Sequence, residues 1–393
     1  MKQPPVSIFV IISVALVLLA NAGCDCMCSA NKSGITVPNP VTAIPVEATE
    51  SWNFVVSGDS RNCGDVVMPA IAEGTHQNKG VFYWHLGDLR ATYDFDEDYR
   101  QGLIAEKKEP LIANYLGDSE GKNIGEWQDF RKYQVLPFGE TPFFLGIGNH
   151  ETIWPQSRER FAKEFADLFD RRELKDQRLV DLHKHNASQD TGPKTYFHWI
   201  VGTVDFIYLD NASKDQLSAA QLAWFENVLK DDREARSKIT TVVVGMHAAL
   251  PNSLSLGHSM NQASDGGKSG LQVYNNLLDL QNNGGKKVYV LASHSHFFMD
   301  GTFKTLYWRD HGGQLQGWII GTAGAFRYVL PDEAKLANAA KTGVYGYLLG
   351  TVATDGSINF GFHEFNESDI PAAVVGRYTP KFVHWCFAEN KEK

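Results

Sequence analysis

Cysteine and clustered positive charge are both scarce in this sequence. The 393 residues include five cysteines, and Cys24, Cys26 and Cys28 lie close together near the start. Only Cys63 and Cys386 fall in the rest of the chain, where they either form a disulfide or pack as two free thiols. No run of Lys and Arg exceeds two residues, and the formal net charge is -9. Since a polyanion is attracted by a basic surface, we do not expect nucleic acid to be the main partner.

The start of the chain also lacks an apolar run long enough to span a membrane. Residues 8–20 are almost wholly apolar, but this run is shorter than the roughly 20 residues that a spanning helix needs. Lys2 before it and small residues after it predict a cleaved signal peptide over residues 1–22. We therefore expect an exported protein, periplasmic or extracellular. Cys24 is placed as a lipidated cysteine would be, although the residues before it do not match a bacterial lipobox, so membrane anchoring through Cys24 stays open.

Residues 23–50 differ in composition from the rest of the chain. They are rich in small residues, Pro and Thr and show no helical or strand period, which predicts a flexible tether. The folded domain then covers residues 51–393. With 43% hydrophobic and 12% aromatic residues, the chain can fill a substantial core.

Short apolar runs recur along the domain and are separated by segments of helix length. Runs that are apolar nearly throughout indicate strands buried on both faces of a largely parallel sheet. The predicted strands are 54–56, 81–84, 143–147, 196–200, 204–209, 241–245, 287–292, 317–321, 345–352 and 358–365. The predicted helices are 64–77, 97–115, 157–170 and 216–230.

Polar residues suited to metal binding follow five of these runs. In open α/β sheets, ligands bind beyond the carboxyl ends of the strands. A single Asp or His at the end of a strand is usually a helix cap or a buried group whose hydrogen bonds are made within the core. Such residues at five strand ends are better explained by one shared binding site. Oxygen and imidazole ligands suit Zn, Fe or Mn rather than a metal that prefers thiolates. The residues at these ends are Asp59, Asp88, Asn149 with His150, His247, and His294 with His296.

The segments around these residues resemble motifs of the calcineurin-like metallophosphoesterase superfamily, which includes the purple acid phosphatases. The resemblance covers residues 51 to about 300 and, more loosely, the strands to 365. It implies an α/β fold of two packed mixed β-sheets flanked by helices, a four-layer αββα sandwich. The motifs are Gly58-Asp59-Ser60-Arg61, Gly87-Asp88-Leu89-Arg90, Gly148-Asn149-His150-Glu151, Gly245-Met246-His247 and Ser293-His294-Ser295-His296.

The resemblance also implies roles for the motif residues. Asp88 is expected to bridge two metal ions, because one carboxylate can offer an oxygen to each. The remaining ligands divide into two sets, Asp59 with His296, and Asn149 with His247 and His294. One or two divalent or trivalent ions would then activate a hydroxide for in-line attack on phosphorus. His150 is expected to assist the departing oxygen, work that suits an imidazole with a pKa near 6.5.

Arg61 departs from the family pattern, in which the first motif usually reads Asp-X-His. Arginine cannot lose its proton to become a ligand. Purple acid phosphatases also lack that His and use a Tyr three residues after the second Asp, where this chain has Ala91. Tyr93 or Asp94 is the replacement if the loop is shifted. Three alternatives stay open for Arg61: a contact to the substrate phosphate, a structural ion pair, or the mark of a lost metal site.

Two further residues are predicted to contact the substrate. Arg90 offers a planar fork that suits phosphate, and His258 lies in the segment after His247. The acidic run at residues 94–98 is predicted to be mainly the solvated start of a helix, with a metal role as the alternative.

The sequence therefore predicts metal-dependent hydrolysis of a phosphate mono- or diester, with a small phosphorylated molecule as the substrate. The alternative, suggested by Arg61 and Ala91, is a non-catalytic exported binding protein on a degenerate scaffold of the same family. A metal-dependent nuclease is disfavoured by the acidic net charge.

Overall fold

The computed structural model describes residues 44–46, 49–91, 96–108, 125–185, 192–212 and 216–392. The chain divides into two compact units, Met1–Thr36 and Val37–Lys393, and every described residue belongs to the second. The predicted signal peptide and Cys24 therefore lie outside the described residues. Within the described ranges, no helix is both long and apolar enough to cross a membrane.

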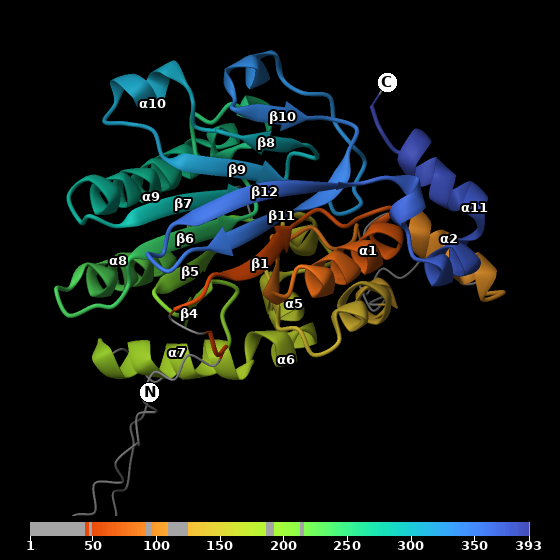
Figure 1. Ribbon diagram of the computed structural model, residues 1–393, viewed down its shortest axis with the longest axis horizontal. Coiled ribbons are helices and arrows are strands. Elements are labelled where there is room, and N and C mark those ends of the chain that lie inside the picture. Colours follow the sequence, from red (N-terminus) through yellow and green to blue (C-terminus); the bar gives the residue numbers. More distant parts are fainter. Residues whose placement is uncertain are drawn as a thin grey trace, which may run out of the picture. The chain divides into compact units, whose positions relative to one another are not determined.

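Two mixed β-sheets form the centre of the second unit (Figure 1). The first has the strand order β12-β11-β1-β2-β3 and the second the order β10-β8-β9-β7-β6-β5-β4. The strands of the first sheet are β1 Trp52–Ser57, β2 Gly80–His85, β3 Phe143–Leu145, β11 Tyr345–Val352 and β12 Ile358–Phe365. The strands of the second are β4 Phe197–Val201, β5 Val204–Leu209, β6 Thr241–Met246, β7 Lys287–Ala292, β8 Phe298–Asp300, β9 Gln316–Ile320 and β10 Ala339–Lys341.

Each sheet has a parallel centre with antiparallel strands beside it. In the first sheet β1, β2 and β3 are parallel, and β11 and β12 join them as an antiparallel pair. In the second sheet β5, β6, β7 and β9 are parallel, while β4 pairs antiparallel with β5 and β8 pairs antiparallel with β9. The carboxyl ends of the parallel strands of one sheet consequently meet at the same edge.

Aromatic side chains join the two sheets face to face. The ring centroids of Phe82 and Phe206 are 5.0 Å apart, as are those of Phe54 and Phe206. Phe144 stacks on Trp199 at 3.9 Å. All five side chains are buried, and aromatic pairs at such distances stabilise a core beyond the area they bury. The apolar runs of the sequence thus build one continuous core between the sheets.

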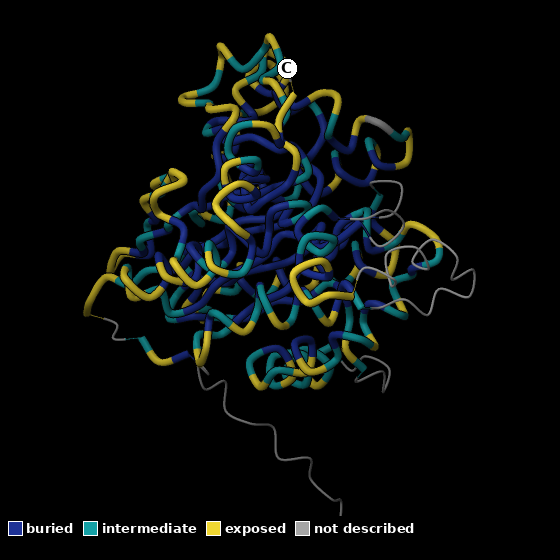
Figure 2. The backbone as a smooth tube through the Cα atoms, turned by 90° about the vertical axis from the view of Figure 1, so that its right-hand side faces the viewer, coloured by how far each residue is buried: buried dark blue, intermediate teal, exposed yellow. Residues whose placement is uncertain are grey.

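Helices cover the outer faces of both sheets, so the predicted four-layer αββα architecture is confirmed (Figure 1). Helices α1 Gly64–Gln77 and α11 Ala372–Ala388 pack on the first sheet, and α8 Ala219–Arg233 and α9 Ser264–Asn282 on the second. Figure 2 shows the buried backbone concentrated in the middle layers. The other α-helices among the described residues are α2 Glu97–Ala105, α4 Gly125–Phe130, α5 Arg158–Glu164, α6 Ala166–Phe169, α7 Arg172–Lys184 and α10 Leu306–Asp310.

The predicted elements agree with the structure where the apolar pattern is strong. The helix predicted at 64–77 has the bounds of α1, and each predicted strand overlaps an observed one. Helix α2 ends at Ala105, before the predicted end at 115, and residues 109–124 lie outside the described ranges. Helices α4, α7, α9, α10 and α11 were not predicted. The apolar pattern of α11 is interrupted at Thr379, which has a φ of 69° before Pro380, and α9 has two glycines in its first turn.

Cys63 and Cys386 form a disulfide, which decides between the two alternatives left open by the sequence. The bond joins the residue before α1 to the last turn of α11, across 323 residues of sequence. Disulfides persist mainly in oxidising compartments, in agreement with a protein that functions outside the cytoplasm.

Candidate metal centre

The six predicted metal ligands all follow strands of the two sheets. Asp59 follows β1, Asp88 follows β2, Asn149 follows β3, His247 follows β6, and both His294 and His296 follow β7. Hydrogen bonds tie the loops together: Gly58 N–H donates to the Ile320 carbonyl at 3.0 Å and Asp59 N–H to the Gly87 carbonyl at 3.0 Å. The first of these bonds connects the two sheets, so the ligands of both are held at one place.

The ligand atoms form two groups that share Asp88. One group contains Asp88, His247 and His294, and the other contains Asp59, Asp88 and His296; within each group the ligand atoms lie within 4.8 Å of one another. Asn149 Oδ1 lies 3.0 Å from His247 Nε2 and so adjoins the first group. The structure therefore brings the residues together in the two sets that the family resemblance implied. Metal binding itself stays a prediction.

Backbone carbonyls orient two of the imidazoles. His247 Nδ1 lies 3.1 Å from the Leu86 carbonyl oxygen, and His296 Nδ1 lies 2.6 Å from that of Phe326. Because a carbonyl only accepts, each Nδ1 carries the proton and donates. The Nε2 atom of each ring then faces a carboxylate. His247 Nε2 lies 3.3 Å from Asp88 Oδ2, and His296 Nε2 lies 3.3 Å from Asp59 Oδ1. Metal-binding histidines are oriented by outer partners in the same way.

The centre requires positive charge. Asp59 Oδ1 and Asp88 Oδ2 are buried and accept no hydrogen bond, which is costly for an ionised carboxylate. Burial alone would lower the pKa of His247, but the Asp88 carboxylate beside it raises this pKa to about 10. A set of carboxylate and imidazole donors that favours cations this strongly fits Zn, Fe or Mn.

Three of the predicted ligands adopt a backbone conformation that residues other than glycine rarely use. The φ angles are 62° at Asp59, 58° at Asp88 and 65° at His294. Such left-handed residues cost free energy and are found preferentially at functional sites, where the surrounding structure holds them.

Glu151 supplies part of this support and was not among the predicted site residues. Its carboxylate accepts hydrogen bonds from the backbone N–H of Asp88 at 3.0 Å, Leu89 at 2.9 Å and Gly148 at 2.7 Å. It therefore joins the loops after β2 and β3. The position of Glu151 directly after Asn149-His150 was the feature of the sequence that could have indicated this role.

Arg61 and His150 lie side by side at the centre. Arg61 Nη1 donates to His150 Nε2 at 2.7 Å, and that Nε2 lies 3.5 Å from Asp88 Oδ2. Burial lowers the pKa of His150 to about 4; the Asp88 carboxylate opposes this effect and the Arg61 cation adds to it. Arg61 Nε is also 3.6 Å from Asp96, so the structural ion pair, one of the three alternatives for Arg61, is present at the edge of the site. Tyr93 and Asp94 lie outside the described residues.

The prediction of a solvated helix start was wrong for two residues of the acidic run, although α2 does begin at Glu97. Asp96 and Asp98 are fully buried. Asp96 accepts hydrogen bonds from the backbone N–H of Asn62 at 3.0 Å and of Ala91 at 2.7 Å. Burial is tolerated because these carboxylates order the loops on either side instead of facing water.

Arg90 is not brought into the centre, contrary to its predicted contact with the substrate. Its guanidinium is fully buried and contacts Asp65 at 2.5 Å, Asp98 at 2.7 Å and Asp129 at 2.7 Å. Three carboxylates around one cation leave excess negative charge in a buried place. Burial, helped by Asp65, raises the pKa of Asp129 to about 9, and burial raises that of Asp98 to about 7.

We predict that Asp129→Asn flattens the dependence of stability on pH. A carboxyl whose pKa is raised in the folded state stabilises the protein fully below its unfolded pKa, near 4, and this contribution is lost as the pH rises through the folded value. For Asp129 the loss extends to about pH 9. Urea unfolding between pH 6 and 10 should show a smaller decrease in the free energy of unfolding for the variant. Equal slopes would show that Asp129 does not titrate in this range.

His258 and Tyr328 form an aromatic pair beside the candidate ligands. His258 lies at the end of the short helix η4 Leu256–His258, and its ring centroid is 5.3 Å from that of His294. Tyr328 stacks on His258 at 5.0 Å and on His296 at 4.2 Å. The structure thus places His258, a predicted substrate contact, at the centre. Tyr328 was missed because no motif surrounds it.

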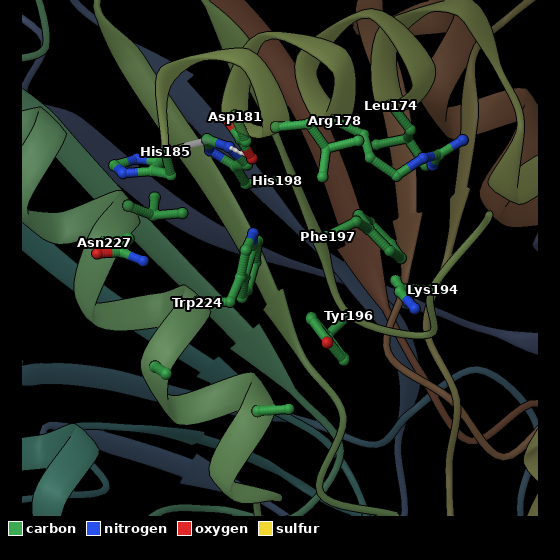
Figure 3. A pocket seen from close by; sticks show the side chains of 14 residues that line it. Leu174, Arg178, Asp181, His185, Lys194, Tyr196, Phe197, His198, Trp224 and Asn227 are labelled. Carbon is green, nitrogen blue, oxygen red and sulfur yellow. Dashed lines mark hydrogen bonds and ion pairs between the residues drawn. The ribbon is translucent and has the colours of Figure 1, made fainter. Parts of the chain in front are cut away.

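A separate cavity of about 390 Å³ lies among α7, β4 and α8 (Figure 3). Its walls include Phe197 and Trp224, and His198 and Asp181 point towards each other on one side. His198 Nε2 lies 2.9 Å from Asp181 and Nδ1 lies 2.8 Å from Asp205. Burial opposes a charge on His198, but the two carboxylates raise its pKa well above the usual value. None of the candidate metal ligands lines this cavity.

Fold and site together define a two-sheet α/β protein with a candidate metal centre at the strand ends. No family model matches the sequence, and no curated protein matches it. Solved structures with a similar fold include a purple acid phosphatase from yellow lupin, with a TM-score of 0.49, 13% identity, and coverage of 82% of this chain and 53% of that chain. This chain therefore spans about half the length of the lupin protein.

Two further solved structures resemble this chain to a similar degree. PhoD has a TM-score of 0.47 and 13% identity, with coverage of 87% of this chain and 78% of that one. GAP50 of Plasmodium, described as the anchor in the inner membrane complex, has a TM-score of 0.46 and 10% identity, with coverage of 87% and 97%. Likeness at this level concerns the fold, and the functional argument rests on the residues of the centre.

Proposed function

We propose that this protein hydrolyses a phosphate mono- or diester of a small molecule at the candidate metal centre. The observation that carries the proposal is the position of Asp88, which belongs to both groups of ligand atoms. Asp59 and Asp88 each keep a buried oxygen that accepts no hydrogen bond, as expected of carboxylates that bind cations. The proposed ligands are Asp59, Asp88, Asn149, His247, His294 and His296.

One or two ions of Zn, Fe or Mn would be held by these residues. When bound, such ions polarise phosphate oxygens and lower the pKa of bound water. Arg61, with 18% of its side chain exposed, would contact the substrate phosphate. His150, next to Arg61, is neutral at pH 7 and would hydrogen-bond the departing oxygen. His258 and Tyr328 supply aromatic rings beside the ligand histidines His294 and His296.

Metal content and hydrolysis together test the proposal. The purified protein should contain metal and should hydrolyse p-nitrophenyl phosphate or its bis ester, and a chelator should abolish the activity. Protein that binds metal but hydrolyses neither ester would favour the alternative, a non-catalytic exported binding protein, which Arg61 in place of the usual His suggests. Export itself is proposed from the signal peptide and the disulfide, and the mass of the mature N-terminus checks it.

Arg61→Ala is predicted to lower kcat/KM without removing metal. One charge-assisted hydrogen bond to phosphate is worth roughly 1.5–3 kcal/mol, which corresponds to about a 10- to 150-fold loss. Steady-state kinetics with metal analysis measures both quantities. Arg100→Ala is the control. Arg100 lies in α2, where it pairs with Glu97 of the same helix, and it contacts no candidate ligand. Wild-type kinetics in Arg61→Ala would show that Arg61 has no contact with the substrate phosphate that matters for catalysis.

A further inference from the structure

Arg327 is a buried cation that no carboxylate contacts within the described ranges. Its side chain donates to the carbonyl oxygens of Cys386 at 2.7 Å, Phe387 at 3.0 Å and Asn390 at 3.1 Å. Cys386 and Phe387 belong to the last turn of α11, where helix carbonyls lack partners and a positive charge is favoured. Arg327 therefore binds the C-terminal end of α11.

The peptide group between Phe326 and Arg327 connects this helix end to a candidate metal ligand. Its N–H, from Arg327, donates to the Asn390 carbonyl at 3.1 Å. Its carbonyl, from Phe326, accepts the Nδ1 proton of His296 at 2.6 Å. Because both bonds are made by one planar unit, the contacts of Arg327 with the end of α11 also set the direction of the carbonyl that orients His296.

The same helix end reaches Asp59, the other residue of this ligand set. Cys386 is bonded to Cys63, four residues after Asp59. Ala325, two residues before Arg327, donates its N–H to the Asp59 carbonyl at 2.9 Å. The loops that carry Asp59 and orient His296 are thus both attached to the end of α11.

The other ligand set, with His247 and His294, is supported by other residues. His247 Nδ1 contacts Leu86 and Ser293, each at 3.1 Å, and the loop of Asp88 is held by Glu151. A disturbance at the end of α11 should therefore affect one set more than the other.

We infer that Arg327 is a positioning residue for His296, and that the disulfide-linked end of α11 sets the metal affinity of the Asp59 and His296 set. The inference rests on the proposed function, since it requires metal at the centre. It assigns a role in the centre to a residue that contacts neither metal nor substrate.

Zinc affinity in a double-mutant cycle tests this inference. We expect Arg327→Met to weaken zinc binding about 10- to 100-fold for one class of ion, the usual effect of losing an outer partner, in competition with a chromophoric chelator. In a His296→Ala background the same change should have no further effect, because its target is gone. Arg327→Lys keeps the charge but not the planar fork, and should restore only part of the affinity.

Leu277→Ala is the control for general loss of stability. Leu277 is buried in α9, on the second sheet, and its removal should lower the melting temperature without changing zinc affinity. Effects of Arg327→Met and His296→Ala that simply add, or unchanged affinity in both Arg327 variants, would overturn the inference. Wild-type protein that binds no zinc, iron or manganese would overturn the proposed function instead.

Discussion

Asp88→Asn is expected to reduce phosphoester hydrolysis by more than about 100-fold, the upper end of what loss of an outer partner costs a metal site. An amide has one carbonyl oxygen and no charge, so it cannot serve two groups of ligands as the Asp88 carboxylate does. Bound metal should fall as well, and His294→Ala should lower it through the Asp88, His247 and His294 group alone. Metal analysis and hydrolysis of p-nitrophenyl phosphate measure the two effects.

His363→Ala serves as the control for Asp88→Asn and His294→Ala. His363 lies in β12 and stacks on Tyr347, away from every candidate ligand. All three variants should retain the circular dichroism of the wild type. Full metal content and full activity in Asp88→Asn would remove the basis of the site assignment.

Gly148→Ala is expected to disable the centre almost as thoroughly, although it adds a single methyl group. A Cβ at Gly148 would overlap both the side chain and the backbone nitrogen of Asp88. Asp88 cannot retreat, because its backbone is held by Glu151 at 3.0 Å and it already has a φ of 58°. The variant should therefore lose metal and activity, and overpacking of this kind costs about 1–3 kcal/mol of stability.

Gly376→Ala separates this steric effect from the general effect of replacing a glycine. Gly376 lies in α11, and a Cβ there meets no atom within 4 Å. In a helix, Ala is favoured over Gly by about 1 kcal/mol, so this variant should be slightly more stable and fully active. The two variants can be compared by thermal unfolding and metal content. If Gly148→Ala kept its metal, the close approach of the β2 and β3 loops would not be needed for binding.

The sequence by itself determined most of the strands and the ends at which the candidate ligands lie. Buried parallel strands appear as short apolar runs, and each run stops where the chain reaches a polar loop, so this information is local. Asp59, Asp88, Asn149 and His247 could be placed at strand ends for that reason. Their common site could be expected because parallel strands end at the same edge.

Only the tertiary structure decided which polar residues meet at the centre and which do not. Arg90 and Arg61 stand in similar motif positions, but Arg90 is enclosed by three carboxylates while Arg61 contacts His150. Tyr328 stacks on His296, and Arg327 binds the end of α11; no local pattern in the sequence signals either contact. The disulfide joins cysteines 323 residues apart, and such pairings depend on how separate segments pack rather than on their own sequences.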